Sequence, residues 1–267
     1  MMKVGFIGGG KMAEALIGAL LVNGVSSPEE LAVGEPLPGR RQTLAEEYRV
    51  QVTADNRKAI AGAELVVVAV KPNQFSTVAA NLQGQLRVQQ TAVSIMAGIT
   101  LQRLRESLRH ERVVRVMPNP PAQIGEGMSV WTATREVDET ARQKVQQLLQ
   151  AAGKELYVEE ERFIDMATAV SGSGAGFVFL LIEAFIDGAV HIGVPRDMAR
   201  ELVVQTFAGS AALVDRSDKT PGDLRAMTTT PGGTTAEGLL VLEEAGIRAA
   251  VTEALIAAFE KSKALGG

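Results

Sequence analysis

The chain has 267 residues, 46% hydrophobic and 22% charged, which is the balance of an ordinary globular protein with one large or two modest domains. Its net charge of −4 provides no basic footprint for nucleic acid or an acidic membrane. Without cysteine, disulfides, thiolate catalysis and Cys-based metal sites are excluded, and two distant histidines, His110 and His191, argue against a His-rich metal site. No signal sequence precedes the first strand, and the most apolar segment, 177–182, is too short to span a bilayer. We therefore expect a cytoplasmic protein with no bound metal.

The N-terminal segment combines a strand, a glycine turn and a helix. Residues 3–7 predict a short buried strand, and residues 12–21 predict a helix with one apolar side. Between them, Gly8, Gly10 and Ala13 fit the pattern G-x-G-x-x-A. In this pattern the first glycine permits a tight turn, the second lets a pyrophosphate approach the backbone, and the small third residue lets the helix lie close to the strand. The N–H groups that open the helix then face the phosphates, so this unit predicts a dinucleotide-binding fold.

Strands and helices alternate through the next part of the chain. Further strands are expected at 31–33, 50–53, 64–70, 91–95, 112–117, 125–132 and 155–158. Helices are expected at 39–48, after a cap at Asp55 or Asn56, after 71–73, at 101–108 behind a Thr100 cap, and at 137–151. The run at 64–70 is almost continuously apolar and β-branched, as in a strand buried on both faces. This alternation predicts an α/β fold with a parallel, doubly wound sheet.

The pattern changes near residue 160, where strand-like runs end and helix-forming segments take over. We expect a dinucleotide-binding domain at 1–159 and an all-helical domain at 160–267. Helices are predicted at 162–169, 176–192, 196–215 and 239–263. The segments from 176 onward are rich in Ala, Val, Leu and Phe, and a domain of this size has limited core volume to bury them. They form either an intrachain core or a symmetric dimer interface, and we favour the interface.

In a doubly wound sheet, ligands bind at the loops that follow the carboxyl ends of the strands. The loop after the second strand contains Glu35, Arg40 and Arg41. A carboxylate here would pair with the free 2′-hydroxyl of NAD, whereas an arginine would pair with the 2′-phosphate of NADP. Because both residue types are present, this loop does not decide between NADPH and NADH, and the arginines could also simply begin a solvated helix.

Two further segments are rich in small and hydroxylated residues. Residues 228–235, TTTPGGTT, precede an expected helix and present hydroxyls and backbone N–H groups that suit a small anion such as a carboxylate. Residues 171–174, SGSG, have the same character ahead of the helix expected at Gly176. Both segments are also compatible with ordinary loops that cap a helix.

None of the candidate loops contains a histidine. A dehydrogenase that acts on an alcohol needs a base for the hydroxyl proton. Reduction of a C=N bond needs less, because an imine arrives protonated and its carbon accepts a hydride directly. A hydroxyl that holds the nitrogen and a site for a substrate carboxylate would then be sufficient.

Taken together, these segments resemble the pyrroline-5-carboxylate reductases over essentially the whole chain. The resemblance rests on GFIGGGKMAEALIGALL at 5–21, AVKP at 69–72, RVMPN at 115–119, IGEG at 124–127, SGSG at 171–174, DGAVHIGVPRDMA at 187–199 and TPGGTT at 230–235. It implies reduction of 1-pyrroline-5-carboxylate to L-proline, the last step of proline biosynthesis, with NADPH as the cofactor and NADH as an alternative. It also implies interlocked helical domains in a homodimer or larger homo-oligomer, with each active site shared between two chains.

The resemblance also implies roles for individual residues. Thr235 would hydrogen-bond the ring nitrogen, and the Thr230 hydroxyl would bind the substrate carboxylate with the N–H groups of Gly233 and Thr234. Ser171 and Gly172 are added as substrate-binding candidates. The expected cofactor-binding residues are Gly8, Gly9, Gly10, Lys11, Met12, Glu35, Arg40, Asn56, Ala69, Val70, Lys71, Pro72, Ala97, Gly98 and Asn119.

The chain departs from the family pattern at four places. Thr230 replaces a serine and keeps the hydroxyl, whereas Pro120 replaces a threonine and removes a donor beside the nicotinamide. The pair 175–176, Ala-Gly, replaces Pro-Ala and would loosen the start of a helix. Glu35 followed by Pro36 is not the usual polar pair, which bears on the preference for NADP.

Two other classes compete with an imine reductase. A β-hydroxyacid dehydrogenase would use a lysine of the helical domain as its acid–base group, and residues 160–218 contain no lysine. A dinucleotide sensor or scaffold would bind the cofactor without turnover. The TPGGTT segment argues against the sensor, because a sensor does not need hydroxyls for a substrate.

Overall fold

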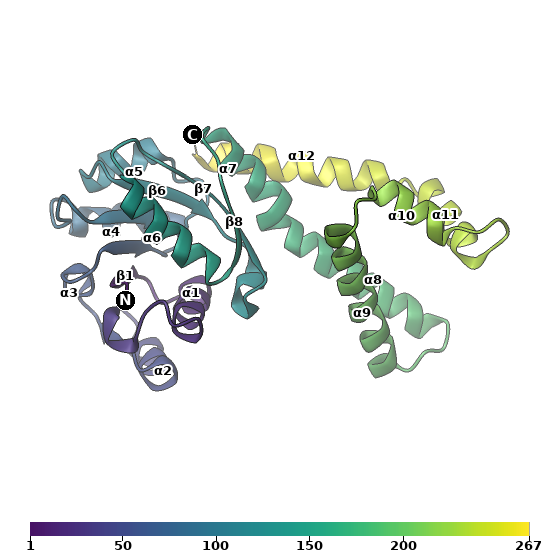
Figure 1. Cartoon of the computed structure of the whole chain (residues 1–267), viewed down its shortest axis with the longest axis horizontal. Helices are drawn as coiled ribbons and strands as arrows, with labels where there is room; N and C mark the ends of the chain where they lie inside the picture. Colours follow the sequence, from purple (N-terminus) through teal and green to yellow (C-terminus); the bar gives the residue numbers. More distant parts are fainter. Residues whose placement is uncertain (267) are drawn as a thin grey trace. The chain divides into compact units, whose positions relative to one another are not determined.

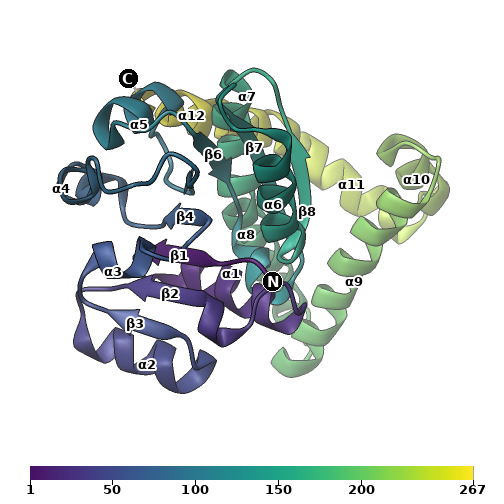
Figure 2. The ribbon, with the colours of Figure 1, turned by 60° about the vertical axis from the view of Figure 1, so that its left-hand side comes forward.

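The computed structural model describes residues 1–266. Within this range eight strands form one sheet in the order β3-β2-β1-β4-β5-β6-β7-β8. Figure 1 labels β1, β6, β7 and β8 of this sheet. The strands are β1 (Val4–Ile7), β2 (Leu31–Gly34), β3 (Gln51–Thr53), β4 (Leu65–Val68), β5 (Thr91–Ser94), β6 (Val113–Met117), β7 (Gly127–Ala133) and β8 (Gly153–Tyr157). Strands β1, β2 and β3 pair in parallel and lie side by side in Figure 2. The strand order reverses between β1 and β4, which is the position where doubly wound sheets bind ligands.

Two strands depart from the predicted parallel sheet. β7 runs antiparallel to β6, with Val116 opposite Trp131. β8 pairs in parallel with β7 and therefore runs in the same reversed direction. The connection between β6 and β7 contains only the short helical turn η3 (Pro120–Ile124). A parallel crossover needs a connection of a dozen or more residues, usually a helix, so this short segment can only return the chain in the opposite direction.

Helices cover both faces of the sheet because alternate strand residues point to opposite sides. Val4 and Phe6 belong to one core with α1 (Lys11–Val22), α2 (Pro38–Tyr48) and α6 (Glu139–Gln150). Ile7 belongs to the other core with α3 (Asn56–Ile60), α4 (Phe75–Leu82) and α5 (Leu101–Leu108). The predicted helix starts at Asp55 and Thr100 are confirmed, because their side chains accept the N–H groups of Arg57 and Arg103.

The SGSG segment is helical, so the expectation that it forms a loop is wrong. α7 (Arg162–Ala167) continues through a π-helical turn, η4 (Thr168–Ser173), directly into α8 (Gly174–His191). The Ala-Gly pair at 175–176 therefore lies inside a continuous helix and does not loosen a helix start. This helix has 30 residues, 162–191, and is long and apolar enough to cross a membrane by length and composition alone. The apolar segment 177–182 is therefore part of a helix long enough to span a bilayer, which corrects the expectation that was based on the segment alone.

The helices α9 (Arg196–Arg216), α10 (Pro221–Thr228), α11 (Thr234–Glu244) and α12 (Ile247–Gly266) complete the chain. The single helix predicted at 239–263 is in fact two helices, because Gly246 has a φ of +74°, which a helix cannot contain. By its internal contacts the chain divides into one compact unit of residues 1–175 with the segment from 258 onward, and a second unit of residues 176–257. This division differs from the boundary expected near 160.

The second unit has almost no core of its own. Among its described residues only Ala199 and Val203 are buried hydrophobics. Its large exposed hydrophobic residues are Val178, Phe179, Leu180, Phe185, Val190, Ile192, Met198, Leu202, Val204, Leu213, Val214, Met227, Leu240, Val241, Leu242, Val251 and Ile256. A monomeric protein rarely exposes so much contiguous apolar surface, so these helices have the surface expected of an interface.

Candidate functional site

The turn between β1 and α1 has the backbone geometry that a pyrophosphate requires. Gly8 has a φ of +97°, and a Cβ placed there would lie 2.9 Å from the carbonyl oxygen of Ala69. A Cβ on Gly10 would meet nothing within 4 Å. Gly10 is also the N-cap of α1, and no side chain of this residue caps the first N–H groups of the helix. These observations fit a dinucleotide whose phosphates bind at the N-terminus of α1.

The two glycines are therefore expected to respond differently to alanine. Gly8→Ala should lower the free energy of unfolding by about 1–3 kcal/mol, because a side chain is strained at positive φ and collides with Ala69. Gly10→Ala should change stability by less than about 0.5 kcal/mol and weaken dinucleotide binding about tenfold. Urea unfolding and titration of cofactor fluorescence measure the two effects. The assignment of different roles to Gly8 and Gly10 would be contradicted if both variants lost the same affinity for the dinucleotide and Gly8→Ala lost no stability.

Glu35 supports the glycine turn. Its Oε2 accepts the N–H of Gly9 at 2.9 Å, its Oε1 accepts the N–H of Leu37 at 2.9 Å, and the residue is only 7% exposed. Both carboxylate oxygens of Glu35 thus already bind backbone N–H groups. The sequence had suggested that this carboxylate would bind the 2′-hydroxyl of the adenosine ribose. Arg41 Nη1 donates to the carbonyl oxygens of Glu35 and Pro36.

Arg40 binds the other side of the glycine turn. Its Nε donates to the carbonyl oxygen of Gly9 at 2.6 Å, and its Nη2 pairs with Glu14 at 2.6 Å. Glu14 also pairs with Lys11 at 3.1 Å and accepts the hydroxyl of Tyr48 at 3.2 Å. Arg40 therefore lies at the glycine turn, and Arg41 lies beside the loop after β2. A 2′-phosphate would bind in this region.

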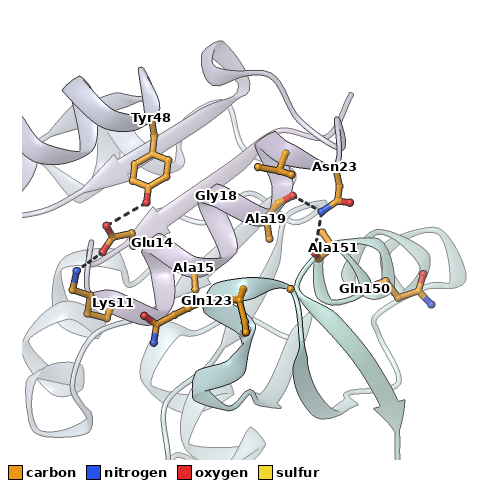
Figure 3. Close-up of a pocket in the computed structure, with 14 residues that line it drawn as sticks. Lys11, Glu14, Ala15, Gly18, Ala19, Asn23, Tyr48, Gln123, Gln150 and Ala151 are labelled. Carbon is orange, nitrogen blue, oxygen red and sulfur yellow. Dashed lines mark hydrogen bonds and ion pairs between the residues drawn. The ribbon is translucent and has the colours of Figure 1, made fainter. Parts of the chain in front are cut away.

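The Glu14 cluster opens onto a cavity of about 650 Å³ along the outer face of α1 (Figure 3). Burial raises the pKa of Glu14, but hydrogen bonds and charge from Arg40 and Lys11 outweigh it, so the pKa lies below its ordinary value. Burial and the Glu14 carboxylate raise the pKa of Tyr48. Both directions are those expected when an ionised Glu14 pairs with Arg40, whose Nε also binds the carbonyl oxygen of Gly9.

Glu14→Gln is expected to reduce stability at neutral pH. A carboxyl whose pKa is lowered in the folded state contributes stability above its unfolded pKa, and this contribution is lost as pH falls through the folded pKa. The difference between wild type and variant should therefore be fully present at pH 7 and shrink below about pH 4.5. Urea unfolding across this range measures it, and a constant difference at every pH would show that the charge of Glu14 is not the cause.

The loops after β4 and β5 lie at the same edge of the sheet. The Ala69 N–H donates to the carbonyl oxygen of Ile7 at 2.8 Å, which holds this loop against the glycine turn. Lys71 precedes the short turn η2 (Pro72–Gln74). Gly98 has a φ of +71° and packs against Leu265, where a Cβ would lie 2.6 Å from the Leu265 Cβ. The expected cofactor-binding residues thus follow the strands of one unit, and Asn56 lies close against Gly34 at the end of β2.

Asn119 connects the end of β6 to the π-helical turn. Its Oδ1 accepts the N–H of Met128 at 2.8 Å, which fixes the orientation of the amide, and its Nδ2 donates to Ser171 Oγ at 3.1 Å. Gly172 lies against Met117, and a Cβ there would be 2.7 Å from the Met117 Cε. The fold therefore brings the substrate candidates Ser171 and Gly172 beside Asn119. π-helical turns are rare and are frequently found at functional sites.

The TPGGTT segment belongs to the second unit and ends in a helix N-terminus. Gly232 has a φ of +69°, the Gly233 N–H donates to the carbonyl oxygen of Thr230 at 2.9 Å, and Gly233 is the N-cap of α11. Thr234 and Thr235 are the first two residues of α11, which has no side-chain cap. The hydroxyl of Thr230 lies so close to Gly233 that no Cβ fits there. The segment presents N–H groups and hydroxyls together, as a carboxylate site requires.

Comparison with known proteins places this geometry in a family. Residues 161–265 match a family model described as pyrroline-5-carboxylate reductase dimerisation, and residues 3–98 match one described as NADP oxidoreductase coenzyme F420-dependent. A pyrroline-5-carboxylate reductase of Synechocystis sp. is 39% identical over 264 residues, with 99% of this chain and 98% of the relative covered. The chain belongs to the pyrroline-5-carboxylate reductase family.

Solved structures agree with this assignment. A pyrroline-5-carboxylate reductase from Coxiella burnetii superposes with a TM-score of 0.91 at 31% identity and covers 100% of this chain and 99% of its own. A Plasmodium falciparum pyrroline carboxylate reductase with NADP bound superposes with a TM-score of 0.92 at 32% identity. The match covers 100% of this chain and 98% of the Plasmodium chain. The predicted fold, a Rossmann-type nucleotide-binding domain followed by a helical dimerisation domain, is confirmed, and the chain is an oxidoreductase.

Family membership also bears on the exposed apolar helices. The dimerisation model spans them, including the whole of the helix 162–191, and exposed apolar side chains are expected in a dimerisation domain. Pro120, which departs from the family pattern, is the first residue of η3, where its missing N–H is tolerated.

The sequence patterns did not single out one buried charge in this unit. Arg115 is 1% exposed on β6 and pairs with Glu161 at 2.9 Å and Asp165 at 2.7 Å. A charged residue inside the apolar strand 113–117 is a signal available in the sequence, because such a charge needs a partner. The partners, however, lie 46 and 50 residues away along the chain.

Proposed function

We propose that this chain reduces 1-pyrroline-5-carboxylate to L-proline with NADPH as the preferred cofactor and NADH as a possible substitute. Membership of the reductase family supports the reaction, and the NADP oxidoreductase match and the NADP-bound relative support the cofactor. The observation that carries the proposal within the chain is the TPGGTT helix N-terminus, because a dinucleotide sensor needs no such site for a substrate carboxylate.

Reduction of a cyclic imine requires little acid–base catalysis by the protein. The bound dinucleotide supplies the hydride that the imine carbon accepts. The Thr230 hydroxyl and the N–H groups of Gly233 and Thr234 hold the substrate carboxylate, and Thr235 hydrogen-bonds the ring nitrogen. The nitrogen arrives protonated and leaves as the secondary amine of proline, so these groups orient the substrate without having to exchange a proton with it.

Residues of the nucleotide-binding unit orient the cofactor. The glycine turn from Gly8 to Gly10 and the N–H groups of α1 bind the pyrophosphate, and Asn119 lies near the nicotinamide. Arg40 and Arg41 flank the loop after β2, where Glu35 already binds two backbone N–H groups. Arg40 Nε and Nη2 are themselves bonded to Gly9 and Glu14, so a 2′-phosphate would be held by the remaining N–H groups of the two arginines.

The active enzyme is a homodimer or a larger homo-oligomer in the cytoplasm. The second unit exposes apolar helices that a second copy of the chain would bury, and the dimerisation family model spans them. Each site would then combine the nucleotide-binding unit of one chain with the TPGGTT segment of its partner. The composition of the chain offers no surface for nucleic acid.

Oxidation of NADPH and of NADH in the presence of supplied 1-pyrroline-5-carboxylate tests the proposal directly. We expect turnover with both cofactors and a larger kcat/KM with NADPH. Tight NADPH binding without any turnover would instead identify a sensor. A larger kcat/KM with NADH would overturn the proposed role of Arg40 and Arg41.

A further inference from the structure

A branched ion-pair network is centred on β6, the strand that leads to Asn119. Arg115 of β6 is 1% exposed, and its two terminal nitrogens bind different carboxylates: Nη1 pairs with Glu161 Oε1 at 2.9 Å, and Nη2 pairs with Asp165 Oδ1 at 2.7 Å. The guanidinium is planar and rigid, so it fixes the separation and direction of both partners. Because each carboxylate continues to a different element, the network has two arms.

The first arm reaches the cofactor loop. Glu161 Oε1 also accepts the N–H of Leu101 at 2.8 Å. Leu101 is the first residue of α5 and comes three residues after Gly98, at the end of the loop expected to lie along the cofactor. Glu161 therefore holds one end of that loop in a defined place relative to β6.

The second arm reaches the π-helical turn. Asp165 Oδ1 also accepts the hydroxyl of Ser262, which is 2% exposed in α12. Asp165 lies on α7, one turn before the π-helical turn that places Ser171 against Asn119. The chain leaves the first compact unit after Ala175 and returns to it at Ala258. The bond between Asp165 and Ser262 therefore connects the segment before the exit with the segment after the return.

We propose that Arg115, Glu161 and Asp165 are positioning residues for the reduction. The Glu161 arm sets the loop that contacts the cofactor, and the Asp165 arm sets the π-helical turn beside Asn119. The inference rests on the proposed function. A network that served stability alone would leave the Kd and kcat of the folded protein unchanged, whereas two positioning arms affect cofactor binding and catalysis separately.

Two isosteric variants separate the arms. In Glu161→Gln, we expect the Kd for NADPH to rise about tenfold, because the loop loses a charged acceptor. In Asp165→Asn, we expect Kd to stay within about twofold of wild type while kcat falls about tenfold through misplacement of the site. Arg115→Lys cannot bind both carboxylates in the same way and should show both changes. Quenching of protein fluorescence measures Kd, and steady-state kinetics measure kcat.

Asp138→Asn is the matched control. It removes a similar pair, Arg112 with Asp138 at 2.8 Å, from the opposite end of β6, and asparagine still caps α6. Circular dichroism and thermal unfolding establish that each variant is folded. We expect the control to match wild type in Kd and kcat.

The inference is overturned if Glu161→Gln and Asp165→Asn change Kd and kcat alike, or if neither differs from Asp138→Asn. Failure of the proposed function is a separate result, in which wild type binds NADPH but does not oxidise it with 1-pyrroline-5-carboxylate. In that case the contrast in NADPH Kd between the two variants still decides whether the arms act separately.

Discussion

Thr235→Ala is expected to lower kcat by roughly 10- to 10³-fold, with almost no change in the affinity for NADPH. The variant loses one hydroxyl, held at the first turn of α11, whose oxygen would accept a hydrogen bond from the protonated ring nitrogen of the substrate. The residues expected to contact the cofactor lie in the other compact unit, so we expect the variant to leave cofactor binding unchanged. Steady-state kinetics with 1-pyrroline-5-carboxylate, together with fluorescence titration of NADPH, measure the two quantities.

The chain offers a matched control for this prediction. The Thr228 hydroxyl already donates to the carbonyl oxygen of Arg225 at 2.9 Å, so Thr228→Ala removes a hydroxyl from the same region without removing a substrate contact. Thr235→Ser keeps a hydroxyl and should restore most of the activity. Unchanged turnover in Thr235→Ala would remove this residue from the mechanism.

Two inactive variants are expected to restore activity when they share a dimer. Gly10→Glu places a carboxylate where the pyrophosphate binds, and its Cβ meets nothing within 4 Å, so the fold is kept. Thr235→Ala impairs the substrate segment. If each site combines units from two chains, a mixed dimer contains one intact site and one site with both defects. Equal co-expression should then yield about a quarter of wild-type activity, well above either parent.

The reciprocal experiment distinguishes shared sites from sites within one chain. A chain with both substitutions, mixed equally with wild type, should retain about a quarter of the activity when sites are shared and about half when each site lies in one chain. Light scattering establishes the oligomeric state of every mixture. No recovery from the two single variants, or a fully active monomer, would rule out the shared site.

Local signals in the sequence predicted the nucleotide-binding half well. The turn through Gly8 and Gly10 was predictable because a tight turn and an approaching phosphate both demand glycine within a few residues. The caps at Asp55 and Thr100 were predictable because a capping side chain binds an N–H group only two or three residues away.

Elements that depend on distant partners were predicted less well. The SGSG segment has low helix propensity, yet packing of Gly172 on Met117 and the bond from Asn119 to Ser171 accompany a helix there. The connection from β6 to β7 is too short for a parallel crossover, so β7 runs antiparallel to β6. The pattern of apolar residues in a strand does not indicate the direction of that strand. The break at Gly246 carried a local signal, a glycine within a helical pattern, that the prediction of one long helix passed over.

The sequence by itself determined the family, the dinucleotide-binding turn and the substrate-like TPGGTT segment, because each is encoded in contiguous residues with specific local chemistry. Only the tertiary structure decided what the charged groups do. Glu35 turns its carboxylate to the N–H groups of Gly9 and Leu37, and Arg115 joins Glu161 to Asp165 across nearly fifty residues. The position of a charged residue in the sequence does not indicate its partner. The partner of a buried charge depends on which elements the fold brings within hydrogen-bond distance.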